Sequence, residues 1–272
     1  MVEILVHFIV PALVGVLIGI ASGLLGIGGG TVMVPIFRLA FGMSATMSTA
    51  TSLFAIIPTS ISGAISHVKG KTCIPALGIA AGLGGACLSP VGVWLAQLSP
   101  DWLVMLAAAL IIGYSAINMF KKAFKLRPAG QPAKGADASA SSDDSPLSRK
   151  QLLQGAAIGL IAGLASGYVG VGGGFIMVPL MLSIIGISMR KASGTSLIAV
   201  MILAIPGVIE QGILGNINYL AGIAIVIGTI PGAVIGAKLV TKVPERTLRL
   251  LFGCFLIVAA VMLVLNEVGV LG

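Results

Sequence analysis

The sequence predicts an all-α fold, a polytopic transmembrane helical bundle made of two inverted repeats of about five hydrophobic segments each, with Gly-rich broken helices. Three observations support this prediction. The 272-residue chain is 57% hydrophobic and 9% charged, and its mean hydropathy is +1.13. Soluble domains carry about 25% charged residues, so lipid must surround most of this surface. Apolar runs of about 20 residues, enough to cross a bilayer, recur along the chain, and one residue pattern occurs twice.

The duplicated pattern defines the domains. Residues 15–35 read GVLIGIASGLLGIGGGTVMVP, and residues 159–179, which lie 144 positions later, read GLIAGLASGYVGVGGGFIMVP without a gap. The repeats are assigned to 1–120 and 151–272. Residues 121–150 are rich in Lys, Ser, Ala, Pro and Asp and are predicted to be a hydrophilic linker. Because the repeat includes the first apolar run, we expect that run to be part of the mature fold rather than a signal peptide.

Each repeat contains five apolar segments. The first repeat has them at 4–26, 31–42, 45–66, 74–98 and 102–120, and the second at 152–169, 175–187, 192–213, 218–240 and 247–265. The second segment of each repeat is short, because twelve helical residues cover about 18 Å against a hydrocarbon thickness of about 30 Å. Segments one and two therefore form either a barely spanning pair or a re-entrant hairpin.

The basic residues predict that the two repeats face opposite sides of the membrane. The loop near 67–73 carries Lys69 and Lys71 and its partner near 211–218 has no basic residue, whereas the neutral loop near 43–47 corresponds to one with Arg190 and Lys191. Lys and Arg collect in cytoplasmic loops. Inversion with an odd segment count places the linker inside, both termini outside, and fifteen of the sixteen basic residues inside. The net charge of +8 therefore indicates topology rather than nucleic-acid binding.

Two glycine loops are the candidate binding elements. They read Gly26-Ile27-Gly28-Gly29-Gly30 and Gly170-Val171-Gly172-Gly173-Gly174 and are followed by Thr31 and Phe175. Glycine runs break a helix, and free backbone groups survive in a membrane where they line a cavity or are buried in protein. The helix that follows each loop exposes N–H donors and the positive end of its dipole, which favours an anion. The alternative is close helix packing through small residues. The substrate-binding prediction comprises Gly28, Gly29, Gly30, Thr31, Gly172, Gly173, Gly174 and Phe175.

Polar side chains in the apolar runs extend this prediction. Thr51, Ser52, Thr195 and Ser196 lie early in the third segment of each repeat and either contact an oxyanion or bond back to a helix carbonyl. Arg38 either recruits an anion or extends to the interface. His67 and Glu210 are candidates for a coupling proton, with an interfacial polar residue as the alternative. The three cysteines form no metal-binding spacing, and we predict no metal, cofactor or catalytic residue.

The doubled segments SGLLGIGGGTVMVP and SGYVGVGGGFIMVP, together with the two Thr-Ser pairs, resemble the sulfite exporter TauE/SafE family of bacterial membrane permeases. The resemblance extends over nearly the whole chain outside the linker. It implies a multi-pass transporter of the bacterial inner membrane, and for such a membrane the charge pattern predicts a cytoplasmic linker and periplasmic termini. Its implied substrate is a small sulfur-containing anion such as sulfite, thiosulfate, a sulfonate or sulfoacetate.

The sequence and this resemblance together predict a secondary transporter that works by alternating access between inverted elements, coupled to an ion or proton gradient. A passive anion channel is the alternative. An intramembrane enzyme is disfavoured, because Ser66 and His67 are sequence neighbours that do not face each other on a helix. The expected partners are the anion and the lipid bilayer, with a homo-oligomer left open and nucleic acid excluded.

Overall fold

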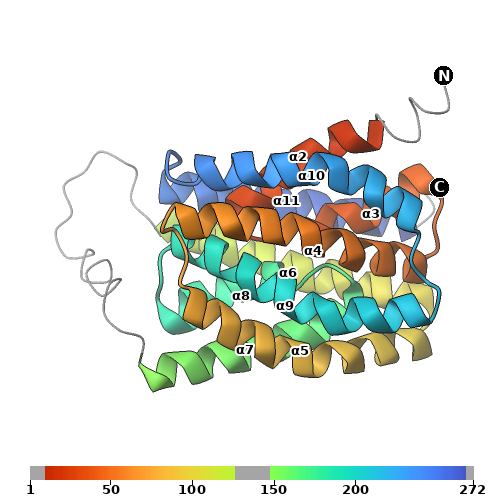
Figure 1. Cartoon of the computed structure of the whole chain (residues 1–272), viewed down its shortest axis with the longest axis horizontal. Helices are drawn as coiled ribbons and strands as arrows, with labels where there is room; N and C mark the ends of the chain where they lie inside the picture. Colours follow the sequence, from red (N-terminus) through yellow and green to blue (C-terminus); the bar gives the residue numbers. More distant parts are fainter. Residues whose placement is uncertain (1–9, 126–147, 268–272) are drawn as a thin grey trace.

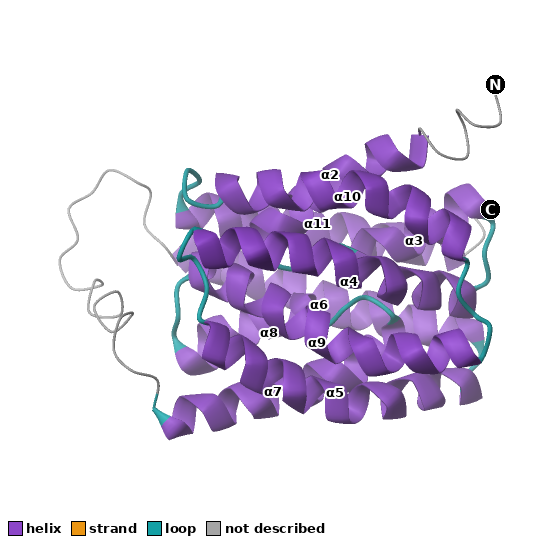
Figure 2. Cartoon of the chain, in the orientation of Figure 1, coloured by secondary structure: helices purple, strands orange, loops and turns teal. Residues whose placement is uncertain are grey.

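The computed structural model describes residues 10–125 and 148–267, which form helices joined by short loops with no β-strand among them (Figures 1 and 2). Seven of these helices are long and apolar enough to cross a membrane. The predicted all-α polytopic bundle is therefore confirmed. The elements are α2 (Val10–Leu25), α3 (Gly30–Phe41), α4 (Ala45–Lys69), α5 (Pro75–Leu98), α6 (Asp101–Lys125), α7 (Arg149–Val169), α8 (Gly174–Leu180), the π-helical turn η3 (Met181–Ile185), α9 (Met189–Ile213), α10 (Tyr219–Leu239) and α11 (Glu245–Glu267).

The helix boundaries follow from local chemistry. Ser44 and Ser188 cap α4 and α9 by accepting hydrogen bonds from the N–H groups of Met47 and Lys191. Ser148 and Gln151 form a capping box at the start of α7. Helix α6 extends five residues into the predicted linker, so residues 126–147 of that linker lie outside the described residues, as do 4–9 of the first predicted segment.

Helices from the two repeats pack in equivalent pairs. Helix α2 lies along α10 and α7 lies along α5, while α6 packs on α11 and α4 on α9. A Cβ atom added to Gly19 would lie 2.4 Å from the Thr229 carbonyl oxygen, and one added to Gly163 would lie 2.1 Å from that of Gly85. These two contacts are related by the 144-residue offset. Small residues thus allow backbones to touch along both pairs.

The short second segment of each repeat, α3 or α8, runs back toward the end of the bundle at which the preceding helix, α2 or α7, begins. Helix α2 reaches the last turn of α4, since His67 Nε2 lies 2.8 Å from the Gly23 carbonyl oxygen. The chain then reverses, Gly28 lies against Ile56 in the middle of α4, and α3 runs back toward the start of α4 (Figure 1). The chain makes the equivalent reversal between α7 and α8. This reversal fits both predicted alternatives, a barely spanning pair and a re-entrant hairpin, so the choice between them stays a prediction.

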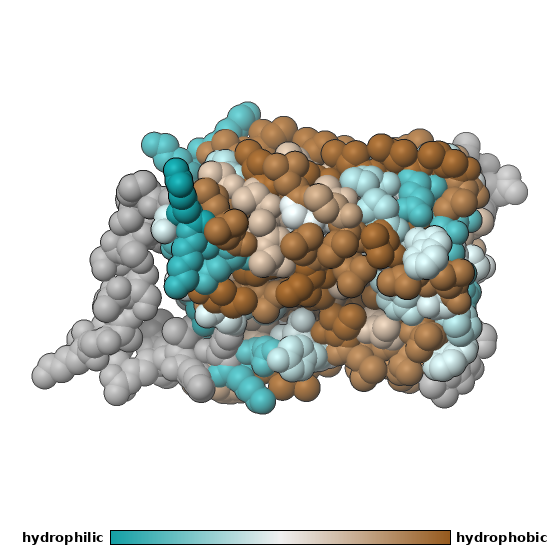
Figure 3. Space-filling model, turned by 90° about the horizontal axis from the view of Figure 1, so that it is seen from below, coloured by the Kyte–Doolittle hydropathy of each residue, from teal (hydrophilic) through white to brown (hydrophobic). Residues whose placement is uncertain are grey.

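The bundle has a hydrophobic middle section and more hydrophilic ends. In Figure 3 a broad hydrophobic belt lies between more hydrophilic ends, and the most hydrophilic side chains gather at one end. Figure 1 places the α4–α5 and α10–α11 turns at the end where α6 stops and α7 begins. These turns carry Lys71 and Lys242. Basic side chains from both repeats therefore share one end of the bundle.

Candidate functional site: the crossing of two glycine loops

The two glycine loops meet in the centre of the bundle. A Cβ atom on Gly30 would lie 2.5 Å from the Val171 carbonyl oxygen, and one on Gly174 would lie 2.5 Å from the Gly26 carbonyl oxygen. Every residue of 26–31 and 170–175 is buried. Backbone contact at this distance leaves no room for a side chain, which explains why the crossing consists of glycine.

Positive backbone dihedrals shape both loops. Gly28 and Gly29 have φ of 73° and 86°, and Gly172 and Gly173 have φ of 88° and 66°. This left-handed region is strained for residues with a Cβ atom. The loops therefore need glycine for two reasons, the positive φ angles and the close approach of the two backbones. The same residues were predicted either to pack helices or to bind substrate.

The first turn of α3 carries unengaged backbone donors. The N–H groups of Val32 and Met33 both donate to the Gly29 carbonyl oxygen, whereas those of Gly30 and Thr31 donate to no backbone carbonyl within residues 10–125 and 148–267. In the second repeat the Gly174 N–H donates to the Gly172 carbonyl oxygen at 2.8 Å. Free donors and the positive dipole end favour negative charge at α3.

Buried hydroxyls without a hydrogen-bond partner are concentrated in the first repeat. A Cβ atom on Gly28 would lie 3.4 Å from Ser60 Oγ, and one on Gly29 would lie 3.6 Å from Ser22 Cβ. Across the described residues, the buried hydroxyls that lack a partner are Ser22, Thr31, Ser48, Ser52, Ser60, Ser89 and Ser166. Six of these seven belong to the first repeat. Because a buried hydroxyl without a partner is costly, those beside the Gly28–Thr31 turn are suited to a polar ligand.

The second repeat keeps Ser166 as the counterpart of Ser22 but lacks two other hydroxyls that lie around the first loop. Phe175 stands where the first repeat has Thr31, and Ala204 stands where it has Ser60. Ser196 is engaged, since its Oγ donates to the carbonyl oxygens of Gly26 at 2.6 Å and Ser193 at 2.8 Å. The polarity of the crossing is therefore offset toward α3.

The predicted threonines lie at a helix junction. Thr195 Oγ1 accepts a hydrogen bond from the Ile74 N–H at 2.9 Å, and Thr51 Oγ1 accepts one from the Asn218 N–H at 3.0 Å. Each threonine thus holds the start of a helix from the opposite repeat. Ser52, the counterpart of Ser196, keeps its hydroxyl unpaired.

The crossing contains no described group of three His, Cys, Asp or Glu that could hold a metal ion. Residues 11–263 match the family described as Sulfite exporter TauE/SafE. This chain belongs to the TauE/SafE family. It is 27% identical over 94% of its length to the Probable membrane transporter protein YunE of Bacillus subtilis, covering 97% of that protein.

Other members of the family are equally full-length matches. The chain is 30% identical to a Probable membrane transporter protein of Haemophilus influenzae, with 92% of this chain and 95% of that protein covered. It is 29% identical to YdhB of Bacillus subtilis, with 87% and 92% covered. No solved structure gives a significant match. Membership and the seven apolar helices together establish a multi-pass membrane protein of a transporter family.

The three predicted recruitment or coupling residues are not brought together. Arg38 is in the last turn of α3, eight residues from Gly30, which corresponds to about 12 Å along a helix. Glu210 lies near the end of α9, with Oε2 buried and without a partner, and His67 lies near the end of α4. Figure 1 places these two helix ends at opposite ends of the bundle. Of the three, the structure connects His67 to a glycine hairpin, through Gly23.

His67 also links the two repeats. Its Nδ1 lies 2.7 Å from Thr72 Oγ1, and a Cβ atom on Gly194 of α9 would lie 2.8 Å from its ring. Its counterpart Gln211 is likewise buried and accepts a hydrogen bond from Asn216 at 2.7 Å. The position therefore needs a buried hydrogen-bonding side chain in both repeats, and the first repeat fills it with a titratable one.

Sequence reasoning missed Ser22 and Ser60, and it missed two carboxylates. Asp101 Oδ2 accepts a hydrogen bond from the Ala45 N–H at 3.2 Å, and Glu245 Oε1 accepts one from the Met189 N–H at 3.3 Å. These carboxylates compensate the positive ends of α4 and α9. Comparison of the two repeats could have found them. Asp101 and Glu245 are both acidic and lie 144 positions apart, and Ser60 is a polar residue at a position where the other repeat has the apolar Ala204.

Proposed function

We propose that this chain is a secondary transporter of a small sulfur-containing anion, of the sulfite, thiosulfate, sulfonate or sulfoacetate type, in the bacterial inner membrane. The observation that supports this proposal is the glycine turn at the start of α3. The N–H groups of Gly30 and Thr31 donate to no backbone carbonyl among the described residues, and the preceding Gly28 and Gly29 approach Ser60 and Ser22, whose hydroxyls are unpaired. Such a site holds an anion by hydrogen bonds and a helix dipole without a cation.

The proposal assigns different roles to the two loops. Gly28, Gly29, Gly30 and Thr31 contact the anion together with Ser52, while Gly172, Gly173, Gly174 and Phe175 close the opposite side. Thr51, Thr195 and Ser196 position the helices that surround the loops, because their hydroxyls are already engaged. A substrate held by few donors and no cation can leave again, which a transporter requires.

Alternating access by the two hairpins is the mechanism that we propose. Each reversal, α2–α3 or α7–α8, begins and ends on one side of the bundle and carries its glycine loop to the crossing, so movement of one of them would open the crossing to its own side. The complete burial of 26–31 and 170–175 supports a closed site rather than an open anion channel. A proton gradient is the proposed energy source, and His67 is the proposed coupling residue because it bonds to the α2 hairpin.

The test is transport by the purified full-length protein in liposomes, comparing sulfite, thiosulfate, sulfoacetate, isethionate, sulfate and chloride under an imposed pH gradient. We expect saturable uptake of a sulfur-containing anion that the gradient drives above equilibrium. Unsaturable movement of many anions without accumulation would support the channel instead. If none of the sulfur anions moves while the protein is folded and correctly inserted, the proposed substrate class is wrong.

A further inference from the structure

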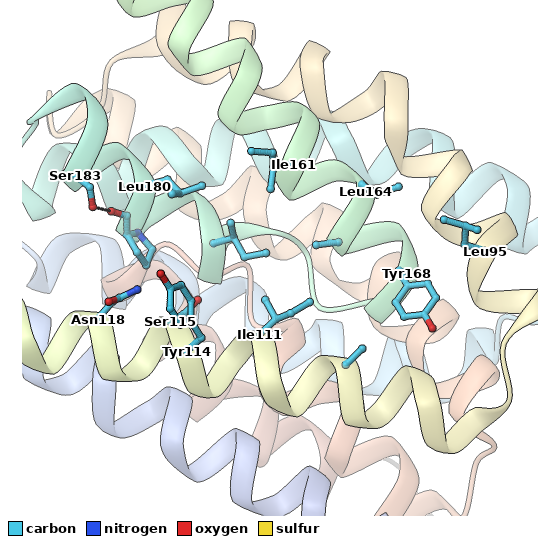
Figure 4. Close-up of a pocket in the computed structure, with 14 residues that line it drawn as sticks. Leu95, Ile111, Tyr114, Ser115, Asn118, Ile161, Leu164, Tyr168, Leu180 and Ser183 are labelled. Atoms are coloured by element: carbon cyan, nitrogen blue, oxygen red, sulfur yellow. Dashed lines mark hydrogen bonds between the residues drawn. The ribbon is translucent and has the colours of Figure 1, made fainter.

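A cavity on the flank of the bundle is independent of the glycine loops. It has a volume of about 900 Å³ and lies between α6, α7, the end of α5 and the α8–η3 segment. Figure 4 shows α6 and α7 as its two long walls, with Leu95 and Tyr168 at one end and Tyr114, Ser115, Asn118 and Ser183 toward the other. Its volume lies at the upper end of the range for ligand pockets, about 300–1,000 Å³.

The cavity is an apolar channel with a polar end. Leu95, Ile111, Ile161 and Leu164 are among the apolar side chains that line it. Ser183 Oγ donates to the Pro179 carbonyl oxygen at 2.6 Å, and the Tyr168 hydroxyl donates to Ser99 Oγ at 3.0 Å, so these two groups are satisfied.

The remaining polar groups of the cavity are available to a ligand. Ser115 and the carboxamide of Asn118 make no hydrogen bond to any other residue of the described chain, and both line the cavity. Polar groups that face hydrocarbon without a partner are expensive. An occupant that offers hydrogen-bonding atoms at this depth would offset that cost.

The equivalent wall in the other repeat shows which residues of the cavity are not required by helix packing. The equivalent positions between α11 and the α2–α3 hairpin carry no polar side chain. Val258 corresponds to Tyr114, Ala259 to Ser115 and Met262 to Asn118. Leu24 and Leu39 likewise correspond to Tyr168 and Ser183. The two walls share one fold, so the five polar side chains are a feature of this cavity and not of helix packing.

The polar end of the cavity adjoins positive charge. Lys121 follows Asn118 by one helical turn on α6, and Lys150 lies in the first turn of α7 on the face that Ile161 and Leu164 continue, at helical spacing. Both lysines are exposed at the end of the bundle where the other basic residues gather. From the Leu95 end to the Asn118 end, the cavity presents an apolar stretch and then hydrogen-bonding groups, and the two lysines lie beyond the Asn118 end, outside the residues that line the cavity.

An apolar stretch, hydrogen-bonding groups and cations, in this order, match the acyl chains, ester oxygens and phosphate of a phospholipid. We propose that the cavity binds a single anionic phospholipid, with its acyl chains along Ile111, Ile161 and Leu164, its ester oxygens at Asn118 and Ser115, and its phosphate near Lys121 and Lys150. Basic residues near the membrane surface attract anionic lipid headgroups. A site of this kind would tie α6 of the first repeat to α7 and α8 of the second.

Native mass spectrometry of the full-length protein, released from a mild detergent after incubation with equal amounts of phosphatidylglycerol and phosphatidylethanolamine, tests the proposal. We expect one retained phosphatidylglycerol per chain. Asn118→Met, which introduces the residue of the other repeat, should reduce that occupancy about tenfold, as the loss of one or two hydrogen bonds implies. The milder Ser115→Ala should reduce it less, and it covers the case in which Asn118→Met fails to fold. Met262→Leu, in the equivalent wall, should leave occupancy unchanged.

Three results would overturn the proposal. One is equal retention by the wild type, Asn118→Met and Ser115→Ala proteins. Another is equal retention of the zwitterionic lipid, and the third is a lipid-free complex of two chains whose cross-links run through α6. None of these readouts depends on transport, so the outcome is separate from that of the proposed function.

Discussion

The Ile74 N–H donates a hydrogen bond to Thr195 Oγ1 at 2.9 Å, which ties the start of α5 in the first repeat to α9 in the second. The equivalent bond joins the Asn218 N–H to Thr51 Oγ1 at 3.0 Å. Because the two bonds connect opposite repeats in both directions, each threonine helps to hold the bundle around the glycine crossing.

Replacing Thr195 with Val should destabilise the protein while preserving substrate affinity. The change leaves the partly buried N–H of Ile74 without its acceptor, which costs about 1 kcal/mol or more. Thermal unfolding in detergent should show a lower midpoint for Thr195→Val and little change for Thr195→Ser. If instead the KM for the anion rises while the unfolding midpoint stays, the hydroxyl contacts substrate and the positioning role is wrong.

Adding a methyl group at the glycine crossing should abolish transport. A Cβ atom on Gly30 would lie 2.5 Å from both the Ile56 side chain and the Val171 carbonyl oxygen, so one loop must shift. We expect Gly30→Ala to reduce the initial uptake rate at least about tenfold, because small displacements at a binding site have large effects. Gly113→Ala is the matched control, since a Cβ atom there meets nothing within 4 Å. Normal uptake by Gly30→Ala would exclude the crossing as the site.

The Ser60 hydroxyl should contribute to anion binding. Its Oγ is fully buried, unpaired and adjacent to Gly28. A hydrogen bond to a charged group contributes about 1.5 kcal/mol or more, so Ser60→Ala should raise the KM for the anion about tenfold with little change in kcat. Ser62→Ala on the same helix is the control, because the Ser62 hydroxyl already donates to the Thr59 carbonyl oxygen. Equal KM values for the two variants would remove Ser60 from the site.

The inverted topology can be tested by accessibility. In a background in which Cys73, Cys87 and Cys254 are replaced, a single cysteine at Lys69 should react from the cytoplasmic side, and one at Leu214 from the periplasmic side. Both positions are exposed, and they lie in equivalent regions of the two repeats. The measurement is labelling of intact cells with a membrane-impermeant thiol reagent. Labelling of both positions from one side would refute the inversion.

Much of the fold was predictable because it depends on composition and repetition. Apolar length identified the helices, and the 144-residue offset predicted which positions would be equivalent, as the matched bonds of Thr51 and Thr195 show. The convergence of the two glycine loops followed from their duplication. The helices follow from the apolar segments themselves, and the equivalent positions follow from the duplication of those segments.

The parts that escaped prediction depend on long-range contacts. The roles of Thr51 and Thr195 could not be separated from substrate binding, because their partners Asn218 and Ile74 are distant in sequence and contribute backbone groups without a signature. The separation of His67 from Glu210 follows from helix direction. Their near-equivalence along the repeats was visible in the sequence, but α4 and α9 run in opposite directions, so the two side chains lie near opposite ends of the bundle.

His67 provides the sharpest test of coupling. Its Nε2 bonds the Gly23 carbonyl oxygen at the end of α2, and the equivalent position of the second repeat is Gln211, so a glutamine amide should be able to replace the structural bond. If His67 carries the coupling proton, His67→Gln should retain anion exchange across liposomes at nearly the wild-type rate but lose accumulation driven by a pH gradient. His67→Ala should lose both activities, because it removes the imidazole that bonds the Gly23 carbonyl oxygen and one of the two partners of the Thr72 hydroxyl. Undiminished gradient-driven accumulation by His67→Gln would assign His67 a structural role and move the coupling group elsewhere.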